Sequence, residues 1–326
     1  METKRNNPWS HLKRPVKDLS IRLVDPDHTL DLFWATDNAG DYLFVWRYKG
    51  HKNKSPKGAL PSLSGMILNH IQDQDDSGRY VLRLIGKEDW EIFMTLCSDL
   101  VEAMRRAESE IGALEIFLRR MDRWQNFLRR KRPTILNESM IKGLIGELQF
   151  LFYRLNPEIG LDAAINAWGG PFGTPQDFCH GDNAFEVKCQ SGGSSPSVRI
   201  TSAEQLTPQV KNLYLYVLTM SQCSEDEDKA LTLPGLIDKI RNKLIQQSSE
   251  ALEKFSDALI EIGYIDSPEY DRFCYILVTE STYRVTDGFP RITTDIISPA
   301  LSRVAYSIPL SACSEFEENS QLNELI

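Results

Sequence analysis

One segment, Thr174–Gln190, constrains the fold of this chain more than any other. Its second part, Ala184–Gln190, alternates between apolar and polar residues, as a β-strand with one buried face does. The preceding His180–Asn183 contains Gly and Asn, which favour a tight reversal of the chain. The segment therefore predicts a β-hairpin. One polar face of its second strand would carry Glu186, Lys188 and Gln190 in a row, with Asp177 on the neighbouring strand.

A closed hairpin would bring Asp177 beside Glu186, and two converging carboxylates suit a hard divalent cation. We therefore expect both residues to ligate Mg²⁺ or Mn²⁺. Zinc is not expected, because no histidine or cysteine pair has suitable spacing. Lys188 could orient or deprotonate a water and steady a phosphate charge, and Gln190 is a candidate nucleic-acid contact. The alternative is a solvated polar strand face, since short motifs of this kind arise by chance.

A helix is predicted just before the hairpin. Asn137 is its expected N-cap, and apolar residues recur at helical spacing from Met140 to Leu155. Glu147 lies at the border of the apolar stripe, where it would reach a site at the helix edge or serve as an ordinary boundary glutamate. Gly143 and Gly146 lower helix propensity, which suggests that something packs closely there.

The chain after the hairpin reads as a flexible loop (191–197), a short strand (198–200), a helix that opens at 201–206 and a buried strand at 213–218. Thr201/Glu204 and Ser202/Gln205 each fit a capping box, so we assign Glu204 and Gln205 to helix capping.

The order helix, strand, turn, strand, strand, helix, strand resembles the core of the PD-(D/E)XK nuclease superfamily. Glu147, Asp177, Glu186 and Lys188 match the four catalytic positions of that core. Pro175 departs from the pattern, because it lies two residues before the aspartate rather than next to it. The resemblance implies an α/β (α+β) fold: a restriction-endonuclease-like core with a mixed central sheet flanked by helices.

Further phrases, at 199–206, 283–292 and 304–308, resemble a bacterial family of PD-(D/E)XK motif proteins. That resemblance implies a metal-dependent DNA endonuclease in a restriction-type, antiviral defence system. It also implies a separate ATPase and a DNA methyltransferase as partners, and it leaves a homodimer open. A non-cleaving DNA-binding or adaptor subunit on the same fold is the alternative, against which the intact Asp, Glu-x-Lys set argues.

The first part of the chain predicts a smaller β-rich domain with helices. Short β-prone runs occupy 20–24, 30–35, 42–46 and 80–84, and two amphipathic helices are expected over 90–104 and 114–128. Pro133 would end the second helix. We therefore expect domains at 1–133 and 134–326, the second with extra helices over 232–260 and strands at 273–278 and 301–308.

Charge is distributed unevenly along the chain. The net charge is −9, yet residues 1–150 carry +3 and residues 151–326 carry −12. Aromatic and basic residues mix in an expected loop at 46–57, and arginines crowd the segment 119–132. Either could track phosphates or be a solvated basic face. We expect nucleic-acid contacts from the loop, at Arg47, Lys49, Lys52 and Lys54.

Several protein classes lack support in the sequence. No apolar run is long enough to span a membrane, and the N-terminus has no signal-peptide core. The six cysteines form no C-x-x-C pair, so free thiols in a cytoplasmic protein are expected. The sequence has no G-x-S-x-G, H-E-x-x-H or P-loop. Any ATP-driven step would therefore need a partner chain.

Overall fold

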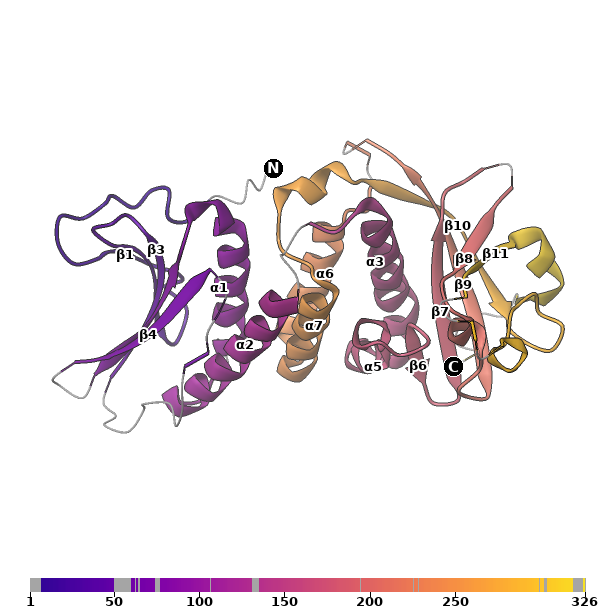
Figure 1. Ribbon diagram of the computed structural model, residues 1–326, viewed down its shortest axis with the longest axis horizontal. Helices are drawn as coiled ribbons and strands as arrows, with labels where there is room; N and C mark the ends of the chain where they lie inside the picture. Colours follow the sequence, from indigo (N-terminus) through magenta and orange to yellow (C-terminus); the bar gives the residue numbers. More distant parts are fainter. Residues whose placement is uncertain are drawn as a thin grey trace. The chain divides into compact units, whose positions relative to one another are not determined.

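The computed structural model describes residues 7–49, 60–61, 63, 65–73, 77–105, 107–130, 135–193, 195–224, 226–227, 229–298, 300–301, 304–318 and 325. The chain divides into two compact units (Figure 1). Unit 1 comprises Met1–Ile135 and Gly263–Pro268, and unit 2 comprises Leu136–Ile262 and Glu269–Ile326. The domain boundary expected at 133/134 lies outside the described residues.

In its described residues, unit 1 contains an antiparallel five-stranded sheet and two helices. The strand order is β1-β2-β3-β5-β4. The strands are β1 (Ser20–Leu23), β2 (Asp31–Thr36), β3 (Tyr42–Tyr48), β4 (Met66–Gln72) and β5 (Gly78–Leu84). A 3-10 turn, η1 (Lys87–Asp89), leads into α1 (Trp90–Met104), which is followed by α2 (Glu110–Arg130).

The sequence located four of these five strands and both helices. It missed β4, whose residues include Asn69, His70 and Gln72 and therefore lack an apolar alternation. It also placed Arg47 in a loop, which is wrong, because Arg47 lies within β3 and pairs with Arg79 and Asp31 of the adjacent strands. The strand continues past the apolar run because cross-strand pairing, rather than local propensity, sets its end.

Aromatic side chains form the core of unit 1 between the sheet and the helices. The rings of Trp46 and Tyr80 stack at 5.3 Å, and Phe117 of α2 packs against both. Trp9 packs against Trp34 and donates its indole N–H to the carbonyl of Leu43. The opposite sheet face carries a smaller apolar cluster around Val45.

Unit 2 is built on a mixed sheet in the order β12-β10-β9-β7-β6. The strands are β6 (Phe178–His180), β7 (Asn183–Gln190), β9 (Asn212–Gln222), β10 (Tyr275–Arg284) and β12 (Glu317–Glu318). Strands β7 and β9 run parallel, and the other neighbours are antiparallel. A second, two-stranded sheet pairs β8 (Ser197–Ile200) with β11 (Tyr306–Pro309).

The helices of unit 2 begin with α3 (Glu138–Phe150), which Asn137 caps as predicted by accepting the N–H of Met140. A π-helical turn, η2 (Leu151–Leu155), continues it. The remaining helices are α4 (Asn156–Ile159), α5 (Leu161–Ala167), α6 (Leu233–Gln247) and α7 (Ser249–Ile262). Short 3-10 turns complete the unit: η3 (Gly170–Phe172), η4 (Ala203–Leu206), η5 (Pro268–Arg272), η6 (Thr294–Ile296) and η7 (Leu310–Phe316).

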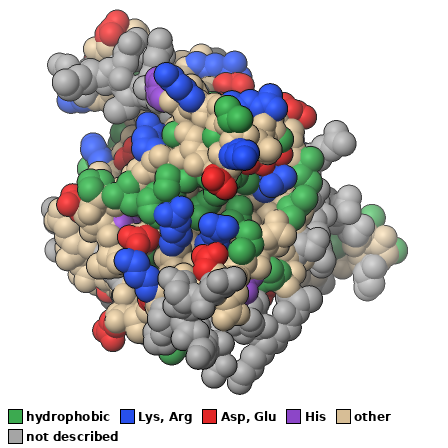
Figure 2. All heavy atoms as spheres, turned by 90° about the vertical axis from the view of Figure 1, so that its left-hand side faces the viewer, with side chains coloured by type: hydrophobic (Ala, Val, Ile, Leu, Met, Phe, Trp, Pro, Cys, Tyr) green, Lys and Arg blue, Asp and Glu red, His purple; other side chains and the backbone are tan. Residues whose placement is uncertain are grey.

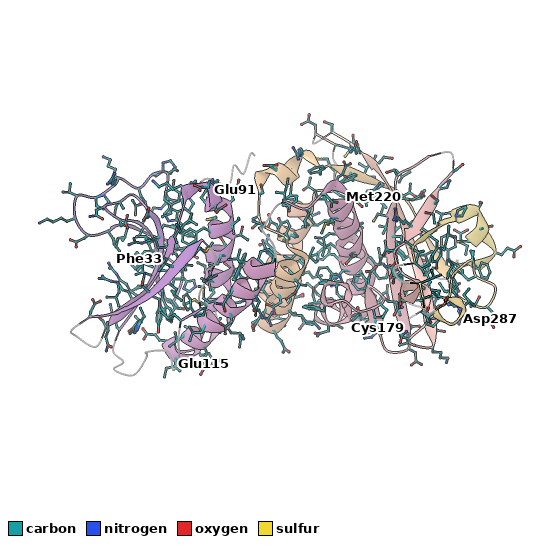
Figure 3. All side chains as sticks on the ribbon, viewed as in Figure 1. Phe33, Glu91, Glu115, Cys179, Met220 and Asp287 are labelled. Atoms are coloured by element: carbon teal, nitrogen blue, oxygen red, sulfur yellow. The ribbon has the colours of Figure 1, made fainter. Side chains whose placement is uncertain are left out.

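Both faces of β7 are covered. On one face, Phe150 of α3 packs against Phe185, and side chains fill the layer between helix and strands (Figure 3). On the other face, Ala184 joins a core cluster with β8, β9 and β11. The solvated polar face considered as the alternative for this strand is therefore wrong, and Glu186 on that face is 0% exposed.

Two further expectations need correction. The helix expected to open at 201–206 is only the short turn η4, because the chain bends away at Thr207, which has extended backbone angles. The strand expected at 301–308 is β11, which begins only at Tyr306, and it is not the last strand, because β12 follows it. The architecture itself is the predicted α+β fold with a mixed central sheet flanked by helices. Among the described residues, no helix is long and apolar enough to cross a membrane.

Candidate functional site

The hairpin register places Asp177 at an open stretch of the β7 edge. Strand β6 pairs with β7 only over Asn183–Phe185. Beyond Phe185, the backbone N–H groups on this edge of β7 therefore have no partner on β6. Asp177, directly before β6, takes one of them: Val187 N donates to its Oδ2 at 2.8 Å. The carbonyl of Asp177 accepts the N–H groups of Gly169 and Gly170. These bonds fix both the backbone and the carboxylate of Asp177.

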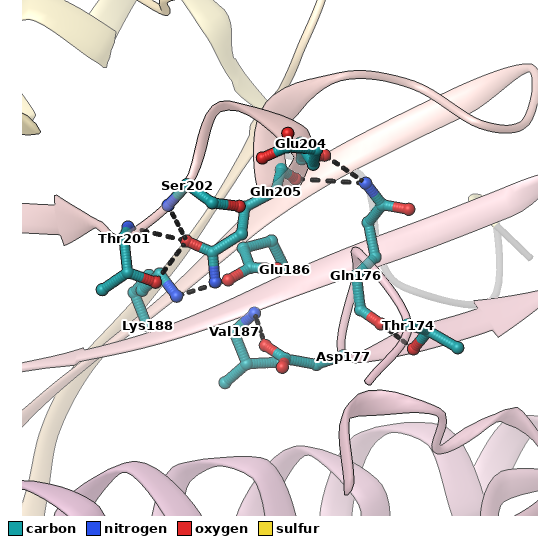
Figure 4. Close-up of polar contacts among 10 residues, drawn as sticks. All are labelled: Thr174, Gln176, Asp177, Glu186, Val187, Lys188, Thr201, Ser202, Glu204 and Gln205. Carbon is teal, nitrogen blue, oxygen red and sulfur yellow. Dashed lines mark hydrogen bonds and ion pairs between the residues drawn. The ribbon is translucent and has the colours of Figure 1, made fainter. Parts of the chain in front are cut away.

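Glu186, which is fully buried, and Lys188, which is partly buried, form an ion pair on the neighbouring part of β7 (Figure 4). Lys188 Nζ donates to Glu186 Oε1. The other oxygen, Glu186 Oε2, is buried and has no hydrogen-bond partner in the structure described. A buried carboxylate oxygen without a partner costs free energy unless a ligand satisfies it. Oε2 is therefore the carboxylate oxygen of this group that is available to a ligand.

Glu147 reaches the same place from α3. Its Oε2 accepts a hydrogen bond from Trp168 Nε1 at 2.7 Å. A Cβ atom added to Gly170 would lie 3.0 Å from Asp177 Oδ1 and 3.5 Å from Glu147 Oε2. Both carboxylates thus border the small space above Gly170, and a side chain at that position would intrude on them.

The site brings together three carboxyl groups, of which that of Glu186 is fully buried, and one ammonium, and their pKa values reflect this imbalance of charge. Burial, followed by the charge of Asp177, raises the pKa of Glu147 to about 8. Burial also raises the pKa of Asp177 and, well above its usual range, that of Glu186. Burial alone would lower the pKa of Lys188, but the surrounding carboxylates outweigh it and keep the lysine protonated. Without a cation, the site therefore retains protons on its carboxyl groups.

The donor set fits magnesium or manganese better than zinc. All candidate ligands are carboxylate oxygens, and Mg²⁺ is usually held by one or two carboxylates, with waters and substrate phosphates completing its shell. No cage of three or more acidic, His or Cys side chains is preformed among the residues described. That is the arrangement expected where substrate and water supply most of the ligands.

The predicted nucleic-acid contacts fall in different environments. Gln190 is buried, and its amide donates to Thr219 Oγ1 at 2.8 Å, so it lies inside the sheet rather than on the surface. Arg47 is exposed on β3, with its guanidinium 5.0 Å from the centre of the Phe33 ring. Lys49 is exposed, whereas Lys52 and Lys54 lie outside the described residues. The surface in Figure 2 shows hydrophobic side chains with Lys and Arg among them.

Sequence reasoning missed three residues that shape the site. Trp168 holds Glu147, Gly170 leaves room beside the carboxylates, and Gln176 joins the Asp177 loop to η4. The buried amide of Gln176 donates to the carbonyls of Glu204, Gln205 and Thr207. Of these residues, only Gly170 could have been found from the sequence, because the pair Gly169–Gly170 is typical of a backbone that lies close to another group.

A comparison with protein families agrees with this geometry. The chain matches, over residues 5–311, the family model described as "Putative PD-(D/E)XK family member, (DUF4420)". No curated protein and no solved structure matches the chain. The match spans nearly the whole sequence, including all four residues of the site. The chain therefore belongs to the DUF4420 family of PD-(D/E)XK proteins.

Proposed function

We propose that this protein is a metal-dependent DNA endonuclease that hydrolyses phosphodiester bonds. One observation carries the proposal: Glu186 Oε2 is buried without a partner, beside Lys188 and close to Asp177. This free oxygen could ligate a hard cation, which prefers carboxylate ligands. Family membership supports a nuclease-like site at these residues.

The residues have separate roles in this proposal. Asp177 and Glu186 would hold Mg²⁺ or Mn²⁺, and Glu147 would hold a second ion or anchor the first through water. Such an ion lowers the pKa of a bound water and stabilises charge on a phosphate oxygen. Lys188, kept protonated by the carboxylates, positions the water and places a fixed positive charge at the reacting phosphate. The N–H of Val187 orients the Asp177 carboxylate and favours its ionised form.

The wider setting of the activity rests on the resemblance noted in the sequence. We place the protein in a restriction-like antiviral defence system, acting on DNA in the cytoplasm. A separate ATPase and a DNA methyltransferase would be its partners. Unit 1 would contribute the DNA- or partner-contacting surface through Arg47 and the residues that follow it.

Cleavage of plasmid DNA tests the function directly. The purified chain should nick or linearise supercoiled plasmid with Mg²⁺ or Mn²⁺ and should be inactive in EDTA. Lys188→Ala should slow cleavage by about two to three orders of magnitude while retaining DNA binding. Asp177→Asn should also weaken metal binding. Lys211→Ala, which removes an exposed lysine of unit 2, serves as the control and should cut at the wild-type rate.

A non-cleaving DNA-binding or adaptor subunit is the second candidate. The acidic character of residues 151–326 favours a protein partner over a long DNA track on unit 2. A wild-type chain that binds DNA but leaves it intact with either metal, alone and with its partners, would establish this reading. A Lys188→Ala variant that cuts at the wild-type rate would show that the residues assigned here do not catalyse the reaction.

A further inference from the structure

The turn η4 is anchored to the acidic loop on one side of the site. Gln176, the residue before Asp177, donates its amide to the carbonyl of Glu204 at 2.9 Å and to that of Gln205 at 3.3 Å. The hydroxyl of Thr174 holds the carbonyl of Gln176 at 2.7 Å. The turn and the Asp177 loop are therefore tied together, and a residue on η4 has a fixed place relative to the site.

The side chain of Gln205 is fixed at its oxygen end. Oε1 accepts from Thr201 N at 2.8 Å, Thr201 Oγ1 at 3.0 Å and Ser202 N at 3.4 Å. These bonds complete the capping box of η4 and hold the plane of the amide. Capping uses only the oxygen, and a glutamate would serve equally well there.

The side-chain nitrogen of Gln205, Nε2, takes no part in capping η4. Among the described residues, no hydrogen bond is made by Nε2, and Figure 4 shows the amide extending from the turn toward Glu186 and Lys188. A neutral donor with two N–H groups suits an anionic ligand in a site whose other side chains are mostly carboxyl groups. A glutamate at this position, in addition to Glu147 and Glu186, would instead add negative charge where a phosphate must approach.

We propose that Gln205 is a further catalytic residue, whose side-chain amide donates hydrogen bonds to a non-bridging oxygen of the scissile phosphodiester. The inference rests on the proposed nuclease function. The capping box orients the amide in advance, so the donor needs no reorganisation as charge develops on the phosphate. Gln205 thereby links a structural turn to the reacting group, and Gln176 acts as the positioning residue that holds this turn.

Two variants separate capping from catalysis. Gln205→Glu keeps the oxygen that caps η4 but removes the N–H donors, so melting should stay near the wild-type value while cleavage falls at least about tenfold. Ser202→Ala removes the hydroxyl that accepts the N–H of Gln205, while the backbone N–H of residue 202 still donates to Oε1. It should melt earlier but lose less cleavage than Gln205→Glu, because the N–H donors of Gln205 remain.

A phosphorothioate substrate distinguishes the lost donor from the added charge. Sulfur accepts hydrogen bonds poorly, so Gln205→Glu should slow cleavage less on the diastereomer that carries sulfur at the contacted oxygen. An effect of charge alone would slow the oxygen substrate and both diastereomers equally, and that result would overturn the assignment. So would wild-type cleavage by Gln205→Glu, or equal losses in the two variants. A wild-type chain that fails to cut DNA would instead overturn the proposed function, and this assignment with it.

Discussion

Trp168 donates its indole N–H to Glu147 Oε2 at 2.7 Å; the indole is fully buried and Glu147 is partly buried. The bond favours the ionised carboxylate, while burial and the nearby charge of Asp177 favour the protonated form and raise the pKa to about 8. Trp168 therefore controls how readily Glu147 gives up its proton. It also fixes the direction from which α3 presents this carboxylate to the site.

Trp168→Phe should shift the pH dependence of metal binding upward. Phenylalanine keeps an aromatic ring beside Phe255 but removes the N–H donor, so the pKa of Glu147 should rise further. A hydrogen bond to a charged group is worth about 1.5–3 kcal/mol, which corresponds to about one to two pH units. Titration of Mn²⁺ binding by calorimetry between pH 6 and 9 measures the shift.

Trp124→Phe provides the matched control for this substitution. Trp124 makes the same kind of bond to Asp99 Oδ2, at 3.0 Å, within unit 1. Its loss should leave the pH profile of metal binding unchanged. If wild type and Trp168→Phe had the same pH profile of metal binding, the indole N–H would not influence Glu147, and Trp168 would contribute only the packing of its ring.

Glu147→Gln should stabilise the metal-free protein, and more so at higher pH. The pKa of Glu147 is about 8 in the folded chain and near 4.5 when unfolded, so the folded state binds more protons between these values. Stability therefore falls as pH rises from about 4.5 to 8. The cost removed by the amide reaches at most about 3 kcal/mol at pH 7.

Thermal melting in EDTA at pH 5, 7 and 8.5 tests whether the stabilisation by Glu147→Gln grows with pH. The melting temperature of Glu147→Gln should exceed that of wild type at pH 8.5 and approach it at pH 5. Glu250→Gln, at an exposed position of α7, controls for the change in net charge. A stabilisation that does not grow with pH would mean that the carboxyl group does not titrate in this range.

The sequence predicted the hairpin that brings Asp177 near Glu186 and Lys188, because a hairpin is a local structure. The alternation over Ala184–Gln190 and the turn before it are visible in a single segment, as is the Asn137 cap. The burial of Glu186 was not predictable in this way, because the layer over that face of β7 pairs β8 with β11, and β11 comes from a distant part of the chain. Trp168 and Gln176 were missed for the same reason: their partners lie 21 and 28 residues away.

Substitution of Arg47 and Lys49 tests whether unit 1 contacts DNA. Neutralising both to alanine should weaken DNA binding and lower the slope of log affinity against log salt by about one to two. Arg47 lies against Phe33, where a guanidinium can be held ready for a phosphate. Fluorescence anisotropy with a labelled duplex over a salt series measures both quantities.

The double variant Lys13→Ala, Lys17→Ala is the control. It removes two exposed cations elsewhere on unit 1 and should change the affinity and the salt slope little. Identical slopes for both double variants would assign Arg47 and Lys49 to another role.

Two glycines of α3 offer the last test, because they differ in their surroundings. A Cβ atom on Gly143 would meet nothing within 4 Å, whereas one on Gly146 would collide with Cys189 Sγ on β7. Gly143→Ala should therefore stabilise the protein by up to about 1 kcal/mol through helix propensity alone. Gly146→Ala should destabilise it by about 1–3 kcal/mol, since α3 must move away from the sheet.

The consequence for activity follows from the next residue, Glu147. A displacement of α3 at Gly146 moves this carboxylate away from Asp177, so Gly146→Ala should lose cleavage at temperatures where it remains folded. Adding Cys189→Ala makes room for the new methyl group and should restore both melting temperature and cleavage toward the wild-type values. Such recovery is the coupling expected of two side chains in direct contact. Losses that simply add in the double variant would show that the close approach of α3 to β7 does not position Glu147.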